Sequence, residues 1–208
     1  MVRAPQMQTT LLIVDDFIDN AIGLREAALR LTYPPQEGAF PGRNSLERIN
    51  IEGLAEEVSH LLHEPLAPMQ PLQSHAKCRL TLAGDAGKAK VHIDNSHWSG
   101  ILYLSRPEDC RGGTDFFRHI PTDSDRAPAD HDELVARGYA SFEDMHREII
   151  EKDSVDDTKW ERTMHVPMRF NRLVLLRPWL WHTAGPGFGD RPENGRLVYL
   201  MFFRSAQR

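Results

Sequence analysis

The chain has 208 residues, of which 40% are hydrophobic and 26% charged, and this composition predicts a soluble globular domain. The formal net charge of -5 argues against nucleic acid as the main partner, because phosphate binding needs a basic surface. No apolar stretch approaches the length that spans a bilayer, so we expect no membrane partner. The sequence leaves the oligomeric state open.

Two features indicate a cytoplasmic location. The two cysteines, Cys78 and Cys110, are too few for a disulfide framework and indicate reduced thiols. The apolar run Leu11–Val14 near the N-terminus is only four residues long before two aspartates, which is too short for the apolar region of a signal peptide.

Residues 1–76 are expected to form a helical support. Leu11–Val14 predicts a short buried strand, and Asp16 is a candidate cap for a helix over residues 17–31. Two prolines then end that helix, because proline cannot continue it. A second amphipathic helix is expected over residues 51–63.

From residue 77 the pattern changes to short strands with turn signals between them, which indicates an all-β sandwich or jelly roll. The last apolar runs carry no polar alternation, so their strands are expected to be buried on both faces. The expected strands are Cys78–Leu82, Ala89–Ile93, Gly100–Ser105, Thr114–Arg118, Leu173–Leu176 and Leu197–Phe203.

A polar insertion, residues 121–165, interrupts the strand pattern. It holds 13 acidic and 6 basic side chains, a net charge of -7 in a chain whose total is -5. Ser141 and Asp144 fit a capping box that opens a helix ending near residue 152. Long insertions of this kind tend to be functional or disordered.

His92 and Asp94 stand one residue apart in the stretch VHIDNSHWSG. Residues i and i+2 of an extended chain point the same way, so one imidazole and one carboxylate converge on one point. His182 follows 90 residues later, after an apolar stretch and just before a glycine-rich turn. Two histidines and one carboxylate on one face form the facial triad of non-haem iron(II) oxygenases. For His92 and Asp94 alone, a hydrogen-bonded pair at a strand end is the alternative.

Arg196 lies 14 residues after His182, at the start of the apolar run 197–203. A guanidinium at the mouth of a buried strand needs an anionic partner, because an unpaired buried charge is costly. A dicarboxylate suits it, since the arginine fork matches a carboxylate with two parallel hydrogen bonds. The alternative is a rim arginine paired with an aspartate or glutamate.

An ordered set of motifs resembles the 2-oxoglutarate- and iron(II)-dependent oxygenase superfamily, above all its prolyl-4-hydroxylase-like branch and small uncharacterised bacterial relatives. The resemblance covers roughly residues 77–203 and implies a double-stranded β-helix, that is, a jelly roll. It also implies Fe(II), 2-oxoglutarate and O2 as cofactors and co-substrates, with release of succinate and CO2. The motifs are HID (92–94), GILYL (100–104), GGTDFF (112–117), WHTAGPG (181–187) and GRLVYLMFF (195–203).

The resemblance also implies roles for single residues. His92, Asp94 and His182 would be the catalytic iron ligands. Halogenating relatives lose the carboxylate ligand so that chloride can bind, and the presence of Asp94 therefore favours hydroxylation of an unactivated C–H.

On the co-substrate side, the resemblance implies Arg196 as the anchor of the distal carboxylate of 2-oxoglutarate. Tyr103 and Thr114 fall in stretches that line the same side in relatives. The serine of the common arginine-x-serine pair is replaced by Val198, so Tyr103 is the candidate for the second anchor. A core tyrosine whose hydroxyl is satisfied is the alternative.

Three more residues are candidates for substrate contact: Arg43, Trp98 and His97. A solvated loop arginine is the alternative for Arg43, and core packing is the alternative for Trp98. The insertion 121–165 is expected to lie over the mouth of the active site as a lid.

The sequence therefore predicts a single oxygenase domain over residues 1–208, with a core at 77–203 and the insertion within it. The expected partner is a small-molecule or peptide substrate. The rival is a non-oxidative, cupin-like metal-binding jelly roll, although cupins usually supply three histidines and a glutamate.

Overall fold

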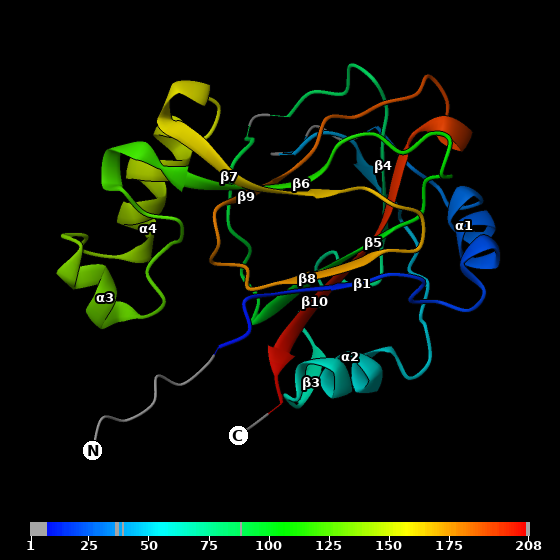
Figure 1. The fold of residues 1–208 in the computed structure, drawn as a ribbon, viewed down its shortest axis with the longest axis horizontal. Coiled ribbons are helices and arrows are strands. Elements are labelled where there is room, and N and C mark those ends of the chain that lie inside the picture. Colours follow the sequence, from blue (N-terminus) through cyan, green and yellow to red (C-terminus); the bar gives the residue numbers. More distant parts are fainter. Residues whose placement is uncertain (1–7, 36–37, 39, 88, 207–208) are drawn as a thin grey trace.

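The computed structural model describes residues 8–35, 38, 40–87 and 89–206, and it is mainly β with antiparallel sheets (Figure 1). The strands are β1 (Leu11–Val14), β2 (Arg43–Asn44), β3 (Leu66–Pro68), β4 (Cys78–Thr81), β5 (Trp98–Tyr103), β6 (Gly113–His119), β7 (Trp160–Pro167), β8 (Leu173–Leu176), β9 (His182–Ala184) and β10 (Arg196–Ser205).

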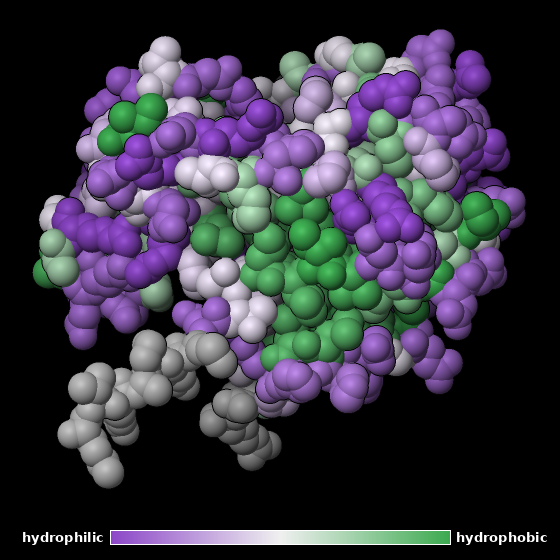
Figure 2. Space-filling view, in the orientation of Figure 1, coloured by the Kyte–Doolittle hydropathy of each residue, from purple (hydrophilic) through white to green (hydrophobic). Residues whose placement is uncertain are grey.

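Within the described ranges these strands form two sheets. The larger sheet has the order β1-β8-β5-β10-β4-β2, with β3 also paired to β10, and the smaller sheet has the order β7-β6-β9. Strands β1 and β7 therefore lie at sheet edges. Figure 2 shows that apolar side chains gather on the side of the molecule where β1 and β8 face the smaller sheet. Ile13 on β1 and Met164 on β7 are exposed at 42% and 39%.

The helices are α1 (Ala21–Leu29), α2 (Leu54–Leu62), α3 (His131–Ala136) and α4 (Phe142–Met145), followed by a π-helical turn, η2 (His146–Glu151). Short 3-10 turns occur at η1 (Ile120–Thr122), η3 (Asp157–Lys159) and η4 (Pro192–Asn194). No helix in the described part of the chain is both long and apolar enough to cross a membrane.

The N-terminal helices are shorter than predicted, and the predicted cap of the first helix is wrong. Asp16 has a φ of 55° and does not cap α1, which begins only at Ala21. Asn20 caps α1 instead, because its side-chain oxygen accepts the N–H of Gly23 at 3.0 Å. Likewise α2 begins only after Gly53, which has a φ of 73°.

Strand β10 explains why the sequence is apolar at consecutive positions. Alternate residues of a strand point to opposite faces. Leu197 and Tyr199 belong to the buried cluster that also contains residues of α2, whereas Val198 belongs to the cluster that includes residues of the smaller sheet. The strand is thus buried on both faces, as the sequence predicted, and Arg196 lies on the face that points toward the smaller sheet, because it is two residues before Val198.

The predicted strand Ala89–Ile93 does not form. Strand β4 pairs with β10 and β2, and within 89–93 only His92 makes an isolated bridge, to His182. The backbone there is satisfied by other partners, since the N–H of Val91 donates to the carbonyl of Ser154 at 3.2 Å. This loop thereby lies against the insertion.

The insertion ends earlier than predicted, because residues 160–165 belong to strand β7. Its helices lie beside the two sheets, at the left of Figure 1. Ser141 caps α4 as predicted by accepting the N–H of Asp144 at 3.1 Å. The insertion's Leu134 and Ile149 form a buried cluster that also includes Val91 and Trp181, each one residue from a predicted metal ligand.

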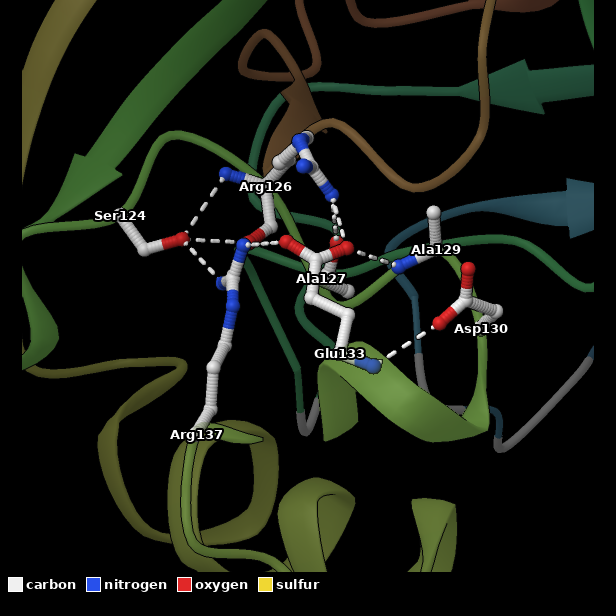
Figure 3. A network of polar contacts seen from close by, with 7 residues as sticks. All are labelled: Ser124, Arg126, Ala127, Ala129, Asp130, Glu133 and Arg137. Atoms are coloured by element: carbon white, nitrogen blue, oxygen red, sulfur yellow. Dashed lines mark hydrogen bonds and ion pairs between the residues drawn. The ribbon is translucent and has the colours of Figure 1, made fainter. Parts of the chain in front are cut away.

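Glu133 is the hub of the polar contacts that hold α3 (Figure 3). Its carboxylate accepts from Arg126 at 2.7 Å, from Arg137 at 2.5 Å and from the N–H of Ala129 at 2.8 Å. Asp130 caps the helix by accepting the N–H of Glu133 at 2.8 Å. The hydrogen bond from Arg126, joined by the one from Ala129, lowers the pKa of Glu133 to about 2.

This network predicts an acid-sensitive insertion. A carboxyl whose pKa is lower in the folded state stabilises that state above its ordinary pKa of 4.5, and the contribution is lost as the pH falls through about 2. Glu133→Gln should lower the thermal midpoint at pH 7, and its difference from wild type should shrink across this pH window. Circular dichroism melts measure this, with Glu148→Gln, an exposed carboxylate in the same insertion, as the control. A difference in thermal midpoint between wild type and Glu133→Gln that stays constant with pH would contradict this role of Glu133.

Candidate metal centre

His92, Asp94 and His182 meet at one point, as the sequence predicted. The loop before β5 carries His92 and Asp94, and His182 begins β9. His92 and His182 exchange two backbone hydrogen bonds, at 2.9 and 3.1 Å, which bring the two segments together. One ligand atom from each of the three side chains lies within 4.8 Å of the others. This spacing suits three ligands of one metal ion.

Backbone carbonyls orient both imidazoles. The Nδ1 of His92 lies 3.0 Å from the carbonyl oxygen of Lys90, and the Nδ1 of His182 lies 2.7 Å from that of Leu180. A carbonyl can only accept, so each Nδ1 carries the proton and each Nε2 keeps its lone pair. The two Nε2 atoms lie 3.8 and 3.5 Å from the carboxylate oxygens of Asp94. Both lone pairs are thus available on the side of the carboxylate.

The carboxylate of Asp94 is held by a serine that the sequence analysis did not single out. The hydroxyl of Ser99 donates to Oδ2 of Asp94 at 2.6 Å, and the hydroxyl of Ser96 lies 2.9 Å from that of Ser99. The Asp94 N–H also donates to the carbonyl of Pro178 at 3.2 Å. The signal in the sequence was a hydroxyl at the start of the strand after the His-x-Asp pair, which by itself is too common to be noticed.

The surroundings keep this cluster in the protonation state that metal binding needs. Burial, with a contribution from His182, lowers the pKa of His92 to about 4. Burial raises the pKa of Asp94, but the neighbouring imidazoles of His182 and His92, together with the hydrogen bond from Ser99, outweigh it and hold that pKa well below its ordinary value. At neutral pH, His92 is therefore a neutral nitrogen ligand and Asp94 an anionic oxygen ligand.

The cluster faces a cavity of about 1160 Å³. Its lining includes residues of β4, β5 and β10 from the larger sheet and of β6, β7 and β9 from the smaller one. The ring centroid of Phe40 lies 4.1 Å from that of His92 at this cavity. Val155 and Asp157, near the end of the insertion, also line it.

Arg196 lines the same cavity and is almost completely buried, with 2% of its surface exposed. Among the described residues its only hydrogen bond is a long one, 3.4 Å from Nη2 to the carbonyl of Gly113, and its Nε has no partner. Burial lowers the pKa of Arg196. The guanidinium is thus a buried cation with unused donors and, within the described part of the chain, no carboxylate partner, whereas a rim arginine would form an ion pair.

Tyr103 and Thr114 lie beside Arg196 but do not line the cavity. Their hydroxyls are 2.6 Å apart, and both side chains are fully buried. The guanidinium carbon of Arg196 lies 5.9 Å from the centre of the Tyr103 ring. Tyr103 therefore supports the arginine, and its role as a second anchor stays a prediction.

The three candidate substrate residues lie outside the cavity lining. Trp98 is buried in the core and His97 bonds to Glu64 at 2.8 Å. Alternation explains Trp98: its neighbour Ser99 points to the metal cluster, so Trp98 points to the opposite face. Arg43 lies 4.0 Å from Asp85 and likewise does not reach the cavity.

Comparison with solved structures shows a similar fold. The crystal structure of HygX from Streptomyces hygroscopicus with nickel, 2-oxoglutarate and hygromycin B bound is 13% identical, with a TM-score of 0.55 over 96% of this chain and 84% of that one. HygX with nickel and 2-oxoglutarate bound is 14% identical, with a TM-score of 0.50 over the same shares. A prolyl hydroxylase from Trichoplax adhaerens, in complex with a hypoxia inducible factor peptide fragment, is 12% identical, with a TM-score of 0.46 over 94% of this chain and 84% of that one.

The resemblance to iron(II)- and 2-oxoglutarate-dependent oxygenases is confirmed by these neighbours at the level of the fold. No curated protein matches the sequence. A family model matches residues 1–203, which is nearly the whole chain, and the protein therefore belongs to the family of unknown function DUF6445.

Proposed function

We propose that this protein is an Fe(II)- and 2-oxoglutarate-dependent dioxygenase whose two antiparallel sheets form a double-stranded β-helix. The observation that carries the proposal is that Arg196, a buried cation with unused donors, shares one cavity with His92, Asp94 and His182. A metal site alone does not require such an arginine. A co-substrate that binds the metal at one end and carries a carboxylate at the other end requires both.

The donor set fits iron(II). His92, Asp94 and His182 would hold the ion through two imidazole nitrogens and one carboxylate, which leaves positions open toward the cavity. The bound iron, with 2-oxoglutarate and O2, supplies oxidation of an unactivated C–H and releases succinate and CO2. Lys90 and Leu180 orient the imidazoles through their carbonyls, and the low pKa of Asp94 keeps the carboxylate charged.

Arg196 would bind the distal carboxylate of 2-oxoglutarate. Its fork offers two parallel hydrogen bonds, and its near-complete burial makes the pairing stronger than in water. The apolar residues Val198 and Leu200, on the same face of β10, line the cavity beyond it and exclude water. A crystal structure of HygX contains both nickel and 2-oxoglutarate, and the similar fold supports the same co-substrate for this protein.

The cavity of about 1160 Å³ is larger than a five-carbon diacid fills, so it has room for a small-molecule or peptide substrate. The proposed reaction is hydroxylation, and the free thiols Cys78 and Cys110 support a cytoplasmic location. Val155 and Asp157 place the end of the insertion at the cavity, which supports a part in substrate selection. The buried cluster shared with Val91 and Trp181 favours a fixed wall, so the lid remains a prediction.

A cupin-like, non-oxidative protein is the less favoured alternative. Such proteins usually bind their metal through three histidines and a glutamate, and they have no need of a buried arginine that faces the metal. The cluster here consists of two histidines and one aspartate, and Arg196 lies in its cavity.

The direct test is turnover. Purified protein with iron(II) and O2 should convert 2-oxoglutarate to succinate, even slowly without the true substrate, and mass spectrometry measures the product. Asp94→Ala and His182→Ala should abolish succinate while circular dichroism remains that of a folded protein. Wild-type protein that binds iron(II) and 2-oxoglutarate but never yields succinate would favour the non-oxidative alternative.

Arg196→Met should weaken 2-oxoglutarate binding to the nickel-loaded protein by roughly thirtyfold or more, because losing one partner of a buried charge pair costs about 2–5 kcal/mol and each 1.4 kcal/mol is about tenfold. Calorimetry measures the dissociation constant. The ligand-free variant should melt no lower than wild type, since the substitution removes an uncompensated buried charge. Arg25→Met, which removes a buried arginine that does not line the cavity, is the control. An unchanged dissociation constant in Arg196→Met would show that Arg196 does not bind 2-oxoglutarate.

Ser99→Ala should weaken binding of nickel(II) by about 10- to 100-fold, because hydroxyl partners of a ligating carboxylate fix its orientation. The matched control is Ser105→Ala, a buried serine whose hydroxyl donates to the carbonyl of Gly195. Titration calorimetry compares the two variants. Equal nickel affinities in Ser99→Ala and wild type would mean that Asp94 holds its position without this hydrogen bond.

A further inference from the structure

A short segment, Phe40–Asn44, borders the cavity beside the metal cluster. Phe40, Pro41 and Asn44 line the cavity. The Phe40 ring is tilted by 43° against the His92 ring, with the ring centroids 4.1 Å apart. Phe40 is half-buried and covers one side of a predicted ligand.

Besides the pairing of β2 with β4, one side chain holds this segment. Arg79 on β4 donates from Nη2 to the carbonyl of Phe40 at 2.6 Å, from Nε to the carbonyl of Pro41 at 2.8 Å and from Nη1 to Oδ1 of Asn44 at 2.7 Å. Gly42 lets the segment come this close, because a Cβ there would lie 2.5 Å from the carbonyl oxygen of Leu80. Its φ of 85° also suits glycine alone.

Holding the segment in this way costs free energy, because Arg79 loses part of its hydration. None of the three acceptors is a carboxylate, and burial together with the nearby Arg196 lowers the pKa of Arg79 to about 10. A partly buried cation that bonds only to neutral oxygens contributes little net stability, and the attraction of Asp85 offsets only part of the desolvation of Arg79. What the arrangement achieves is a fixed position for Phe40 against His92.

We propose that Arg79 is a positioning residue that holds Phe40 over the metal cluster, and that Phe40 is the wall that limits access to the metal from this side. The inference rests on the metal assignment of the proposed function. It assigns to Arg79 and Phe40 a joint part in determining which molecules reach the metal.

The experiment measures the rate at which the metal dissociates from the protein in the absence of 2-oxoglutarate. Protein loaded with cobalt(II) is mixed with an excess of a chelator, and the release rate is followed by absorbance. Phe40→Ala and Arg79→Met should each release cobalt(II) severalfold faster than wild type. Loss of the Arg79 charge alone would act the other way, because a neighbouring cation repels the metal ion. Faster release in Arg79→Met therefore reports the lost position of Phe40.

A double-mutant cycle separates positioning from general damage. If Arg79 acts through Phe40, the double variant should release cobalt(II) no faster than Phe40→Ala, whereas independent accelerations would multiply. Arg79→Lys should resemble Arg79→Met, since an ammonium carries its donors on one nitrogen and cannot reproduce the planar fork that reaches the three acceptors. Phe40→Leu, which keeps part of the wall, should be intermediate, and it replaces Phe40→Ala if circular dichroism shows that the latter is unfolded.

Matched controls remove the same groups elsewhere. Phe142→Ala removes an exposed phenylalanine of the insertion, and Arg25→Met removes a buried arginine that donates to the backbone carbonyl of Glu193. Both should release cobalt(II) as wild type does. Wild-type protein that retains no cobalt(II) would overturn the metal assignment and this inference with it. Retention by wild type, with unchanged release from Phe40→Ala and Arg79→Met or with multiplicative rates in the double variant, would overturn this inference alone.

Discussion

Two backbone hydrogen bonds between His92 and His182 are the constraint on which the rest of the site depends. They join the loop before β5 to strand β9, two segments that lie 90 residues apart. With the backbones fixed, each Nδ1 reaches a carbonyl two residues earlier in its own segment, and each Nε2 faces Asp94. The neighbours Val91 and Trp181 then point into the buried cluster of the insertion. The insertion therefore braces the metal cluster from outside the cavity.

Charged side chains of opposite sign lie at different places around the cavity. Asp94 supplies the negative charge at the metal cluster, while Arg196, which is buried, and Arg79, which is partly buried, place two guanidinium groups on neighbouring strands. The mutual repulsion and desolvation of these groups destabilise the ligand-free protein. A bound anion would offset both effects, and Arg196, whose Nε has no partner, is the candidate to bind it.

Local rules predicted the parts of the site that local geometry determines. The i, i+2 rule placed His92 beside Asp94, and the apolar run of β10 predicted a buried guanidinium at Arg196. Because residues alternate along β5, Ser99 faces the metal cluster and Trp98 faces the opposite side. The sequence alone does not show which set of alternate residues faces the cavity, because that depends on the strands with which β5 pairs. Arg79 could not be predicted for another reason, since its acceptors lie 35 to 39 residues away, in a loop and in the two-residue strand β2. The residues that orient a site thus depend on tertiary contacts that a single sequence does not display.

Within the described residues, strand β1 has no partner on one of its edges and consists of apolar residues, and such an edge is a template for pairing with another chain. The residue that follows the strand, Asp15, binds Arg169 at 2.7 Å and Arg172 at 2.6 Å. Charged residues that flank an apolar strand oppose the addition of a further strand, so this ion-paired cluster counteracts aggregation through β1.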